Sequence, residues 1–207
     1  MPDGDFITII GANGAGKSTL FGAIGGNFLT DSGEILLDGQ NVTFWPEHRR
    51  SKVIGRLFQD PMRGSAPGMT IEENLALAAG RSGWLGHISR RDRECFRAQL
   101  RELNMGLEDR LRQPVGLLSG GQRQRAYIAM VIAQDTEYIL LDEPTNNLDP
   151  ASRDEILKAI AKYEGAIVLV THDEGAVEAL NPERVLLMPD GDEDLWNDSY
   201  LDLVAEE

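Results

Sequence analysis

The chain has 207 residues, 42% of them hydrophobic and 26% charged, and its single cysteine, Cys95, excludes both an intramolecular disulfide and a multi-cysteine zinc site. No apolar run approaches eighteen residues, and the first residues lack the basic and then apolar pattern of a secretory signal, so we expect a cytosolic protein with its own core. The formal net charge of -14 argues against non-specific binding to nucleic acid or anionic lipid.

The N-terminal part predicts a strand, a loop and a helix in succession. Residues 6–10 are a short apolar run rich in β-branched side chains, and a glycine-rich turn separates them from a helical pattern over residues 18–28. Residues 34–39 are typical of a strand that ends in a turn, and residues 53–59 of a further strand.

From Thr70 onward the pattern becomes helical. Residues 70–73, TIEE, form a capping box ahead of an apolar run. Four apolar residues recur at intervals of four, three and four, which places them on one helical face: Phe96, Leu100, Leu103 and Leu107. We expect a single domain over residues 1–207, in which residues 70–117 form a helical subdomain and residues 1–69 and 118–207 form the core.

The C-terminal part alternates helices with apolar strands. A helix is expected from Ser119 to about Gln134, followed by strands over residues 138–141 and 166–170 with a helix between them, and residues 185–188 add a last strand. Fully apolar strands that alternate with helices predict an α/β fold with a mainly parallel sheet flanked by helices on both sides.

Charge is unevenly distributed along the chain. Residues 81–125 carry ten arginines and five acidic residues, whereas residues 190–207 carry eight acidic residues and no basic one. Two interpretations remain open: both segments are solvated faces, or the arginines meet a partner or the acidic tail.

Residues 11–18, GANGAGKS, fit the phosphate-binding loop pattern G-x-x-x-x-G-K-[ST] between a strand and a helix. Glycines let backbone N–H groups surround phosphate oxygens, Lys17 neutralises their charge, and the Ser18 hydroxyl is a magnesium ligand. The pattern therefore predicts a P-loop NTPase. The candidate nucleotide-binding residues of this loop are Gly11, Asn13, Gly14, Ala15, Gly16, Lys17, Ser18 and Thr19.

An apolar strand over residues 138–141 ends in two adjacent carboxylates, Asp142 and Glu143. A carboxylate at this point can hold magnesium through water, and the next one can polarise an attacking water molecule. We assign the first role to Asp142 and the second to Glu143.

A second anion site is predicted where a serine and two glycines open a helix. Ser119, Gly120 and Gly121 would present bare backbone N–H groups and the positive end of the helix dipole, with Gln122 next to them. An ordinary helix cap would also use Ser-Gly, so taken alone this motif leaves both interpretations open. The run LSGGQRQR resembles the signature sequence of ATP-binding cassette (ABC) ATPases, and its neighbours complete the ordered set of motifs of that family.

The resemblance implies three further site residues. Gln59, in FQD, matches the glutamine that contacts magnesium and reports to the helical subdomain. Asp149, in NNLD at residues 146–149, matches the aspartate that communicates across the dimer. His172, in VTHD, matches the switch histidine that contacts the terminal phosphate, so the implied catalytic residues are Lys17, Glu143 and His172.

The resemblance also implies partners and cofactors. In ABC ATPases two domains, either two copies or a pair of related chains, pack head to tail with ATP and Mg²⁺ between the phosphate loop of one and the Ser-Gly-Gly of the other. Such a pair drives a separate membrane permease from the cytoplasmic face of the membrane, and no direct contact with nucleic acid is expected.

Subfamily features differ along the chain. Residues 50–125 resemble ATPase subunits of bacterial importers, whereas residues 146–149 and 163–173 resemble soluble ABC-F proteins that act on ribosomes. No tyrosine or tryptophan precedes Gly11, and Phe6 is expected in the core. Three alternatives follow: another residue meets the base, base binding is weak, or the chain is shortened. Without an upstream aromatic residue, the nucleotide should be held mainly through its phosphates and magnesium. The first hypothesis is a transporter ATPase; the alternatives are an ABC-F type ATPase and a shortened or chimeric, non-catalytic domain.

Overall fold

The computed structural model describes residues 5–60, 62–80, 88–146 and 148–205. The chain packs as two compact units. The first contains the residues up to Arg56, Thr136–Glu143 and the residues from Glu164 onward, and the second contains Leu57–Asp135 and Pro144–Tyr163. The boundaries of these two packing units differ from those of the predicted helical subdomain, residues 70–117. That subdomain stays a prediction.

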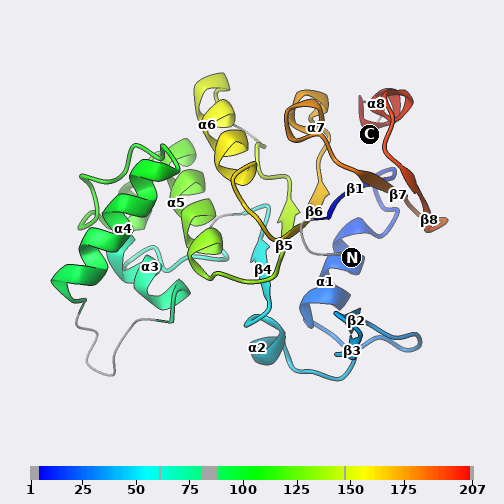
Figure 1. The fold of residues 1–207 in the computed structure, drawn as a ribbon, viewed down its shortest axis with the longest axis horizontal. Coiled ribbons are helices and arrows are strands. Elements are labelled where there is room, and N and C mark those ends of the chain that lie inside the picture. Colours follow the sequence, from blue (N-terminus) through cyan, green and yellow to red (C-terminus); the bar gives the residue numbers. More distant parts are fainter. Residues whose placement is uncertain (1–4, 61, 81–87, 147, 206–207) are drawn as a thin grey trace. The chain divides into compact units, whose positions relative to one another are not determined.

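The first unit is an α/β unit built on one large sheet (Figure 1). Strand β4 ends on Leu57, the first residue of the second unit. The elements in chain order are β1 (Phe6–Ile10), α1 (Lys17–Gly25), β2 (Leu36–Leu37), β3 (Gln40–Asn41), α2 (Glu47–Arg50), β4 (Ile54–Leu57), β5 (Tyr138–Asp142), β6 (Ala166–Val170), α7 (Glu174–Leu180), β7 (Arg184–Leu187), β8 (Asp192–Leu195), a 3-10 turn (Asp198–Tyr200) and α8 (Leu201–Ala205).

The strand order of the sheet is β4-β5-β6-β1-β7-β8. Strands β5, β6, β1 and β7 pair in parallel, and Ile9 lies between Val170 of β6 and Leu186 of β7. The predicted parallel sheet is therefore confirmed. Strand β8 was not predicted, because its residues are acidic and exposed and carry no apolar alternation; it joins the sheet by antiparallel pairing with β7.

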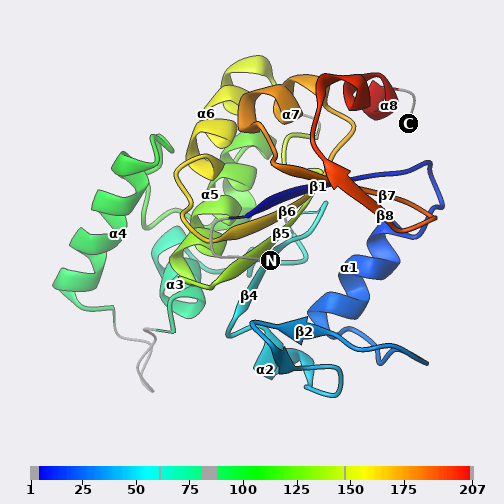
Figure 2. The same ribbon diagram turned by 45° about the vertical axis from the view of Figure 1, so that its right-hand side comes forward.

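Each face of this sheet is covered by helices of the same unit, as Figure 2 shows. Ile9 belongs to a core cluster with Phe21 of α1, whereas its neighbour Ile10 packs in a cluster with Val177 of α7 and Val204 of α8. Successive residues of a strand point to opposite faces, so two adjacent isoleucines contribute to two cores. Phe6 is buried, as predicted.

The second unit is helical, and most of its helices begin at a polar cap. Its elements are α3 (Ile71–Ala78), α4 (Arg90–Glu102), a 3-10 turn (Val115–Leu117), α5 (Gly120–Ala133) and α6 (Pro150–Ile160). Capping boxes start α3 at Thr70 and α4 at Ser89. None of the helices in the described ranges is long and apolar enough to cross a membrane.

The predicted helical face over residues 96–107 is only partly correct. Helix α4 ends at Glu102, with Leu103 as its cap, so Leu107 lies beyond the helix. Asn104, at φ 55°, turns the chain back, and both leucines are nevertheless buried. The apolar spacing thus identified core residues correctly but overestimated the length of the helix.

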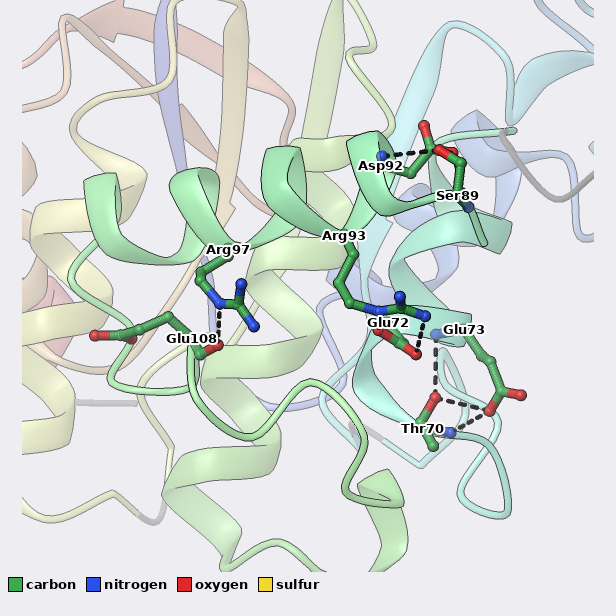
Figure 3. Close-up of polar contacts among 8 residues, drawn as sticks. All are labelled: Thr70, Glu72, Glu73, Ser89, Asp92, Arg93, Arg97 and Glu108. Atoms are coloured by element: carbon green, nitrogen blue, oxygen red, sulfur yellow. Dashed lines mark hydrogen bonds and ion pairs between the residues drawn. The ribbon is translucent and has the colours of Figure 1, made fainter. Parts of the chain in front are cut away.

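An ion pair links α3 to α4 (Figure 3). Arg93 donates from Nε and Nη2 to the Glu72 carboxylate, with an Nη2–Oε1 distance of 3.0 Å. The Glu72 side chain is only 9% exposed and that of Arg93 27%. A bidentate contact of this kind fixes one helix against the other and satisfies a buried charge.

Several arginines of the basic segment are used inside this unit. Arg97 donates to the backbone carbonyl of Glu108 (3.2 Å), Arg123 to the carbonyl of Leu118 (3.1 Å), and Arg125 pairs with Glu155. The basic composition therefore partly reflects internal cross-links, a use that neither sequence-based interpretation included.

Arg93→Ala should lower the melting temperature by about 5 °C, because it leaves the buried Glu72 carboxylate without its partner. Arg90→Ala is the matched control on the same helix, since the Arg90–Glu94 pair is largely exposed and such pairs contribute little. Thermal unfolding of both variants gives the comparison. Equal melting temperatures for the two would show that the buried pair contributes no more than the exposed one.

Candidate functional site

The predicted catalytic groups follow three neighbouring parallel strands. The phosphate loop follows β1, Asp142 ends β5, and His172 comes shortly after β6. In the sheet order β5, β6 and β1 are adjacent. Because the carboxyl ends of parallel strands meet at one edge, residues from distant parts of the chain come together at that edge.

The phosphate loop leads into α1 through Gly16, whose φ of 99° is in the left-handed region that favours glycine. Among the described helices of eight or more residues, α1 is the one whose N-cap side chain accepts no hydrogen bond. Its first-turn N–H groups are thus not capped by a side chain at Gly16, as a phosphate-binding turn requires. A Cβ on Gly11 would lie 2.6 Å from the Met188 carbonyl oxygen, so the loop also needs glycine at its start.

Lys17 is the first residue of α1 and is buried, at 8% exposure. Its Nζ donates a hydrogen bond to the carbonyl oxygen of Gly11, so the ammonium group folds back over the loop. This places its charge within the loop where the sequence predicts phosphate oxygens.

Asp142 lies at the end of β5 among three cationic or ionisable groups. Burial raises the pKa of its carboxyl above the ordinary value, and the charges of Arg56, Lys17 and His172 act in the opposite direction. Arg56 is itself held by the side-chain oxygen of Asn27, at 3.0 Å. A half-buried carboxylate in this setting gains stability from any further cation that binds beside it.

Glu143 is buried and has an unusual backbone conformation. Its φ of 49° is in the left-handed region, and its N–H donates to the Val170 carbonyl, at 2.9 Å. A non-glycine residue in this conformation costs free energy, and such strained residues cluster at functional sites. The turn directs the carboxylate toward the segment after β6.

The Glu143 carboxylate is held by Thr171 and His172. Its Oε2 accepts from the Thr171 hydroxyl (3.3 Å) and from the His172 backbone N–H (3.4 Å), and Nε2 of His172 lies 3.2 Å from Oε1. Burial raises the pKa of Glu143, partly offset by His172. A carboxylate whose pKa is raised is a better proton acceptor near neutral pH, as activation of a water molecule requires.

These features fit a magnesium nucleotide. The side-chain-uncapped start of α1 and the Lys17 ammonium suit phosphate oxygens, and the desolvated carboxylates favour a cation. Ser18 and Thr19 are exposed in the first turn of α1, where their hydroxyls are open to a ligand. Sequence reasoning gave no role to Thr171 or Arg56, because nothing in the chain order indicates that they contact Glu143 or act on Asp142.

The remaining candidate residues belong to the second unit. Gln59 is exposed just after β4, and Asp149 is the N-cap of α6. Asn147, which belongs to the predicted NNLD motif, lies outside the described residues. These placements leave their predicted roles open.

The predicted bare turn at Ser119 is wrong in one respect. Ser119 and Gln122 form a capping box: the Ser119 hydroxyl accepts from the Gln122 N–H at 3.3 Å, and Gln122 Oε1 from the Ser119 N–H at 3.2 Å. The spacing S-x-x-Q is itself a capping pattern, which explains the outcome. Gly120 still faces open space, since a Cβ there would meet no atom within 4 Å.

Comparisons with known proteins identify the family of the chain. A family model of the ABC transporter matches residues 1–146. A tyrosine transport ATP-binding protein of Clostridioides difficile is 36% identical over 184 residues, which are 84% of this chain and 71% of that protein. A "probable siderophore transport system ATP-binding protein" of Bacillus subtilis is 39% identical over 181 residues, 84% of this chain and 63% of that protein.

Among solved structures, a dimeric ATP-binding cassette in a post-hydrolysis state with bound ADP and Pi has a TM-score of 0.74 and 30% identity, and the match covers 94% of this chain and 86% of that one. The fold and site define a P-loop ATPase. The chain belongs to the ABC transporter family, as an ATP-binding and ATP-hydrolysing domain. Both bacterial relatives are ATP-binding proteins of transport systems, so they support the transporter hypothesis and give the ABC-F alternative no support.

Lys17→Ala should weaken the binding of magnesium ATP by at least about tenfold, because it removes the ammonium charge from the phosphate loop. Lys52→Ala, which removes an exposed lysine, is the control. Equilibrium titration with a fluorescent ATP analogue measures both. Equal affinity in Lys17→Ala and the parent would contradict this placement of the phosphates.

Glu143→Gln should stabilise the nucleotide-free protein at pH 8. Burial raises the pKa of Glu143, so the folded state binds a proton on this carboxylate more tightly than the unfolded state does. The parent protein therefore loses stability as pH rises through the raised pKa. The gain in melting temperature, about 2 to 4 °C for each kcal/mol, should shrink toward pH 4, where the parent is protonated. Exposed Glu137, changed to Gln, is the control, and a gain that did not depend on pH would contradict this account.

Proposed function

We propose that this chain is the ATPase subunit of an ABC transporter and works as a head-to-tail dimer. In this arrangement, two ATP molecules lie between the phosphate loop of one copy and the Ser119 turn of the other. The partner is a second copy or a related ABC ATPase. ATP binding closes the dimer, and hydrolysis opens it.

In the proposed site each residue has a defined task. Lys17 and the loop N–H groups bind the phosphates, and Asp142, Ser18 and Gln59 would hold Mg²⁺, Asp142 through water. When bound, the ion would supply positive charge to the terminal phosphates. Glu143 accepts a proton from the attacking water, and His172, already beside Glu143, would contact the terminal phosphate.

The observation that carries the proposal is the position of Glu143 next to His172 at the end of the strands that present the phosphate loop. The Ser119 turn also supports the dimer, because beside its capping box Gly120 faces open space in which the nucleotide of a second copy would fit. A solved structure of similar fold is described as a dimer with bound ADP and Pi, which also favours pairing.

The proposed partner on the membrane side is a permease on a separate chain. The two bacterial relatives are the ATP-binding proteins of a tyrosine and a siderophore transport system, and the match spans 63 to 71% of their lengths. Dimer closure would be passed to the permease near Gln59 and the helical unit, with this chain on the cytoplasmic face of the membrane.

Glu143→Gln should trap the closed, ATP-bound dimer. Glutamine keeps the size of glutamate but accepts no proton, so hydrolysis should fall by about 10²-fold or more, whereas Asp142 still positions Mg²⁺. Loss of a carboxylate near the terminal phosphate also removes a like-charge repulsion. Size-exclusion chromatography with magnesium ATP should show a dimer that persists in the variant and is transient in the parent.

The control is Ser119→Arg introduced into the Glu143→Gln variant. Arginine would fill the anion site offered to the partner's nucleotide, so the double variant should bind ATP and remain monomeric. A Glu143→Gln variant that hydrolyses ATP at the parental rate would remove this residue from catalysis. A double variant that still dimerises with ATP would overturn the head-to-tail arrangement.

A further inference from the structure

The segment that carries Asp149 is tied to helix α6 by both oxygens of one carboxylate. Asp149 Oδ1 accepts from the Ser152 backbone N–H at 3.1 Å, and Oδ2 accepts from the Ser152 hydroxyl at 2.6 Å. The first bond is an ordinary helix cap. The second depends on the side chain of residue 152 and sets the rotation of the carboxylate.

The same serine lies directly against the start of α5. A Cβ added at Gly121 would be 2.7 Å from Ser152 Oγ, 3.2 Å from Ser152 Cβ and 3.6 Å from Asp149 Oδ2. No side chain fits there without displacing the hydroxyl from the aspartate. By contrast, a Cβ at Gly120 would meet nothing within 4 Å.

Two further contacts join α5 to Pro144 and to α6. Gln124 donates from Nε2 to the Pro144 carbonyl in a buried hydrogen bond of 2.9 Å, and Arg125 pairs with Glu155. Together with the Gly121 contact, they hold Pro144, the cap of α6 and Glu155 against α5.

We propose that Ser152 is a positioning residue for ATP hydrolysis. It holds the Asp149 carboxylate against Gly121, so that the turn at Asp149 and the turn at Ser119–Gln122 move together as one rigid body. The inference rests on the proposed head-to-tail dimer, in which both turns of one copy face the ATP of the other. Because the two turns move together, Asp149 would reach the partner chain whenever the Ser119 turn contacts the nucleotide.

Removal of the Ser152 hydroxyl tests this with little damage to the fold, because Asp149 keeps its bond to the residue 152 N–H. Ser152→Ala should lower kcat about tenfold and change the Kd of monomeric protein for magnesium ATP by less than about twofold, since the phosphate loop is untouched. A residue that only supported folding would lower stability without this split between turnover and binding.

A double-mutant cycle supplies the decisive comparison. Gly121→Ala pushes the Ser152 hydroxyl off Asp149, so its loss of kcat should largely overlap with that of Ser152→Ala, and the double variant should be no worse than the poorer single one. Gly120→Ala is the matched control, because its effect should multiply with that of Ser152→Ala. Thermal unfolding of the same variants should show the same coupling at Gly121 and additivity at Gly120.

Parental kcat in Ser152→Ala, or losses that multiply for Gly121→Ala and Ser152→Ala, would overturn the inference. A parent chain without ATPase activity would instead overturn the proposed function. In that case the melting temperatures of the same variants still test the contact between Gly121 and Ser152. Melting-temperature changes that simply add for Gly121→Ala and Ser152→Ala would rule this contact out.

Discussion

Parallel pairing of β1, β6 and β5 is the constraint on which the site depends. Each of these strands ends at the same edge of the sheet, and each is followed by a residue that carries chemistry: the loop before Lys17, Asp142 with Glu143, and His172. The two cores on opposite faces hold the strands in register, because Ile9 and Ile10 each have a separate set of partners. A one-residue slip would exchange these faces and misalign the groups at the edge.

Burial of carboxylates at that edge links stability to function. Glu143 has a left-handed backbone and a desolvated carboxyl, and Thr171 and His172 hold its side chain in place. The left-handed backbone and the desolvated carboxyl each cost folding free energy, and a cation bound beside the carboxylate would offset the cost of desolvation. The packing of the sheet offsets this free-energy cost. Strand ends therefore hold such residues more precisely than loops would.

In the helical unit, side chains of opposite charge reinforce an apolar core to which each of the helices α3, α4, α5 and α6 contributes buried side chains. Arg93 with Glu72 joins α3 to α4, and Arg125 with Glu155 joins α5 to α6. The Gly121–Ser152 contact adds close backbone approach to these ion pairs. Charged hydrogen bonds are directional, so these pairs fix the orientation of one helix against the next.

The sequence by itself determined the class of fold, the phosphate loop, the Asp142–Glu143 strand end and the core residues, because these follow from local spacing and side-chain chemistry. Only the tertiary structure revealed strand β8, which pairs through its backbone without an apolar pattern, and the early end of α4 before Leu107. It alone also brought Thr171 to Glu143 and Ser152 to Gly121. Contacts between residues tens of positions apart depend on how strands and helices pack, and no local pattern encodes that packing.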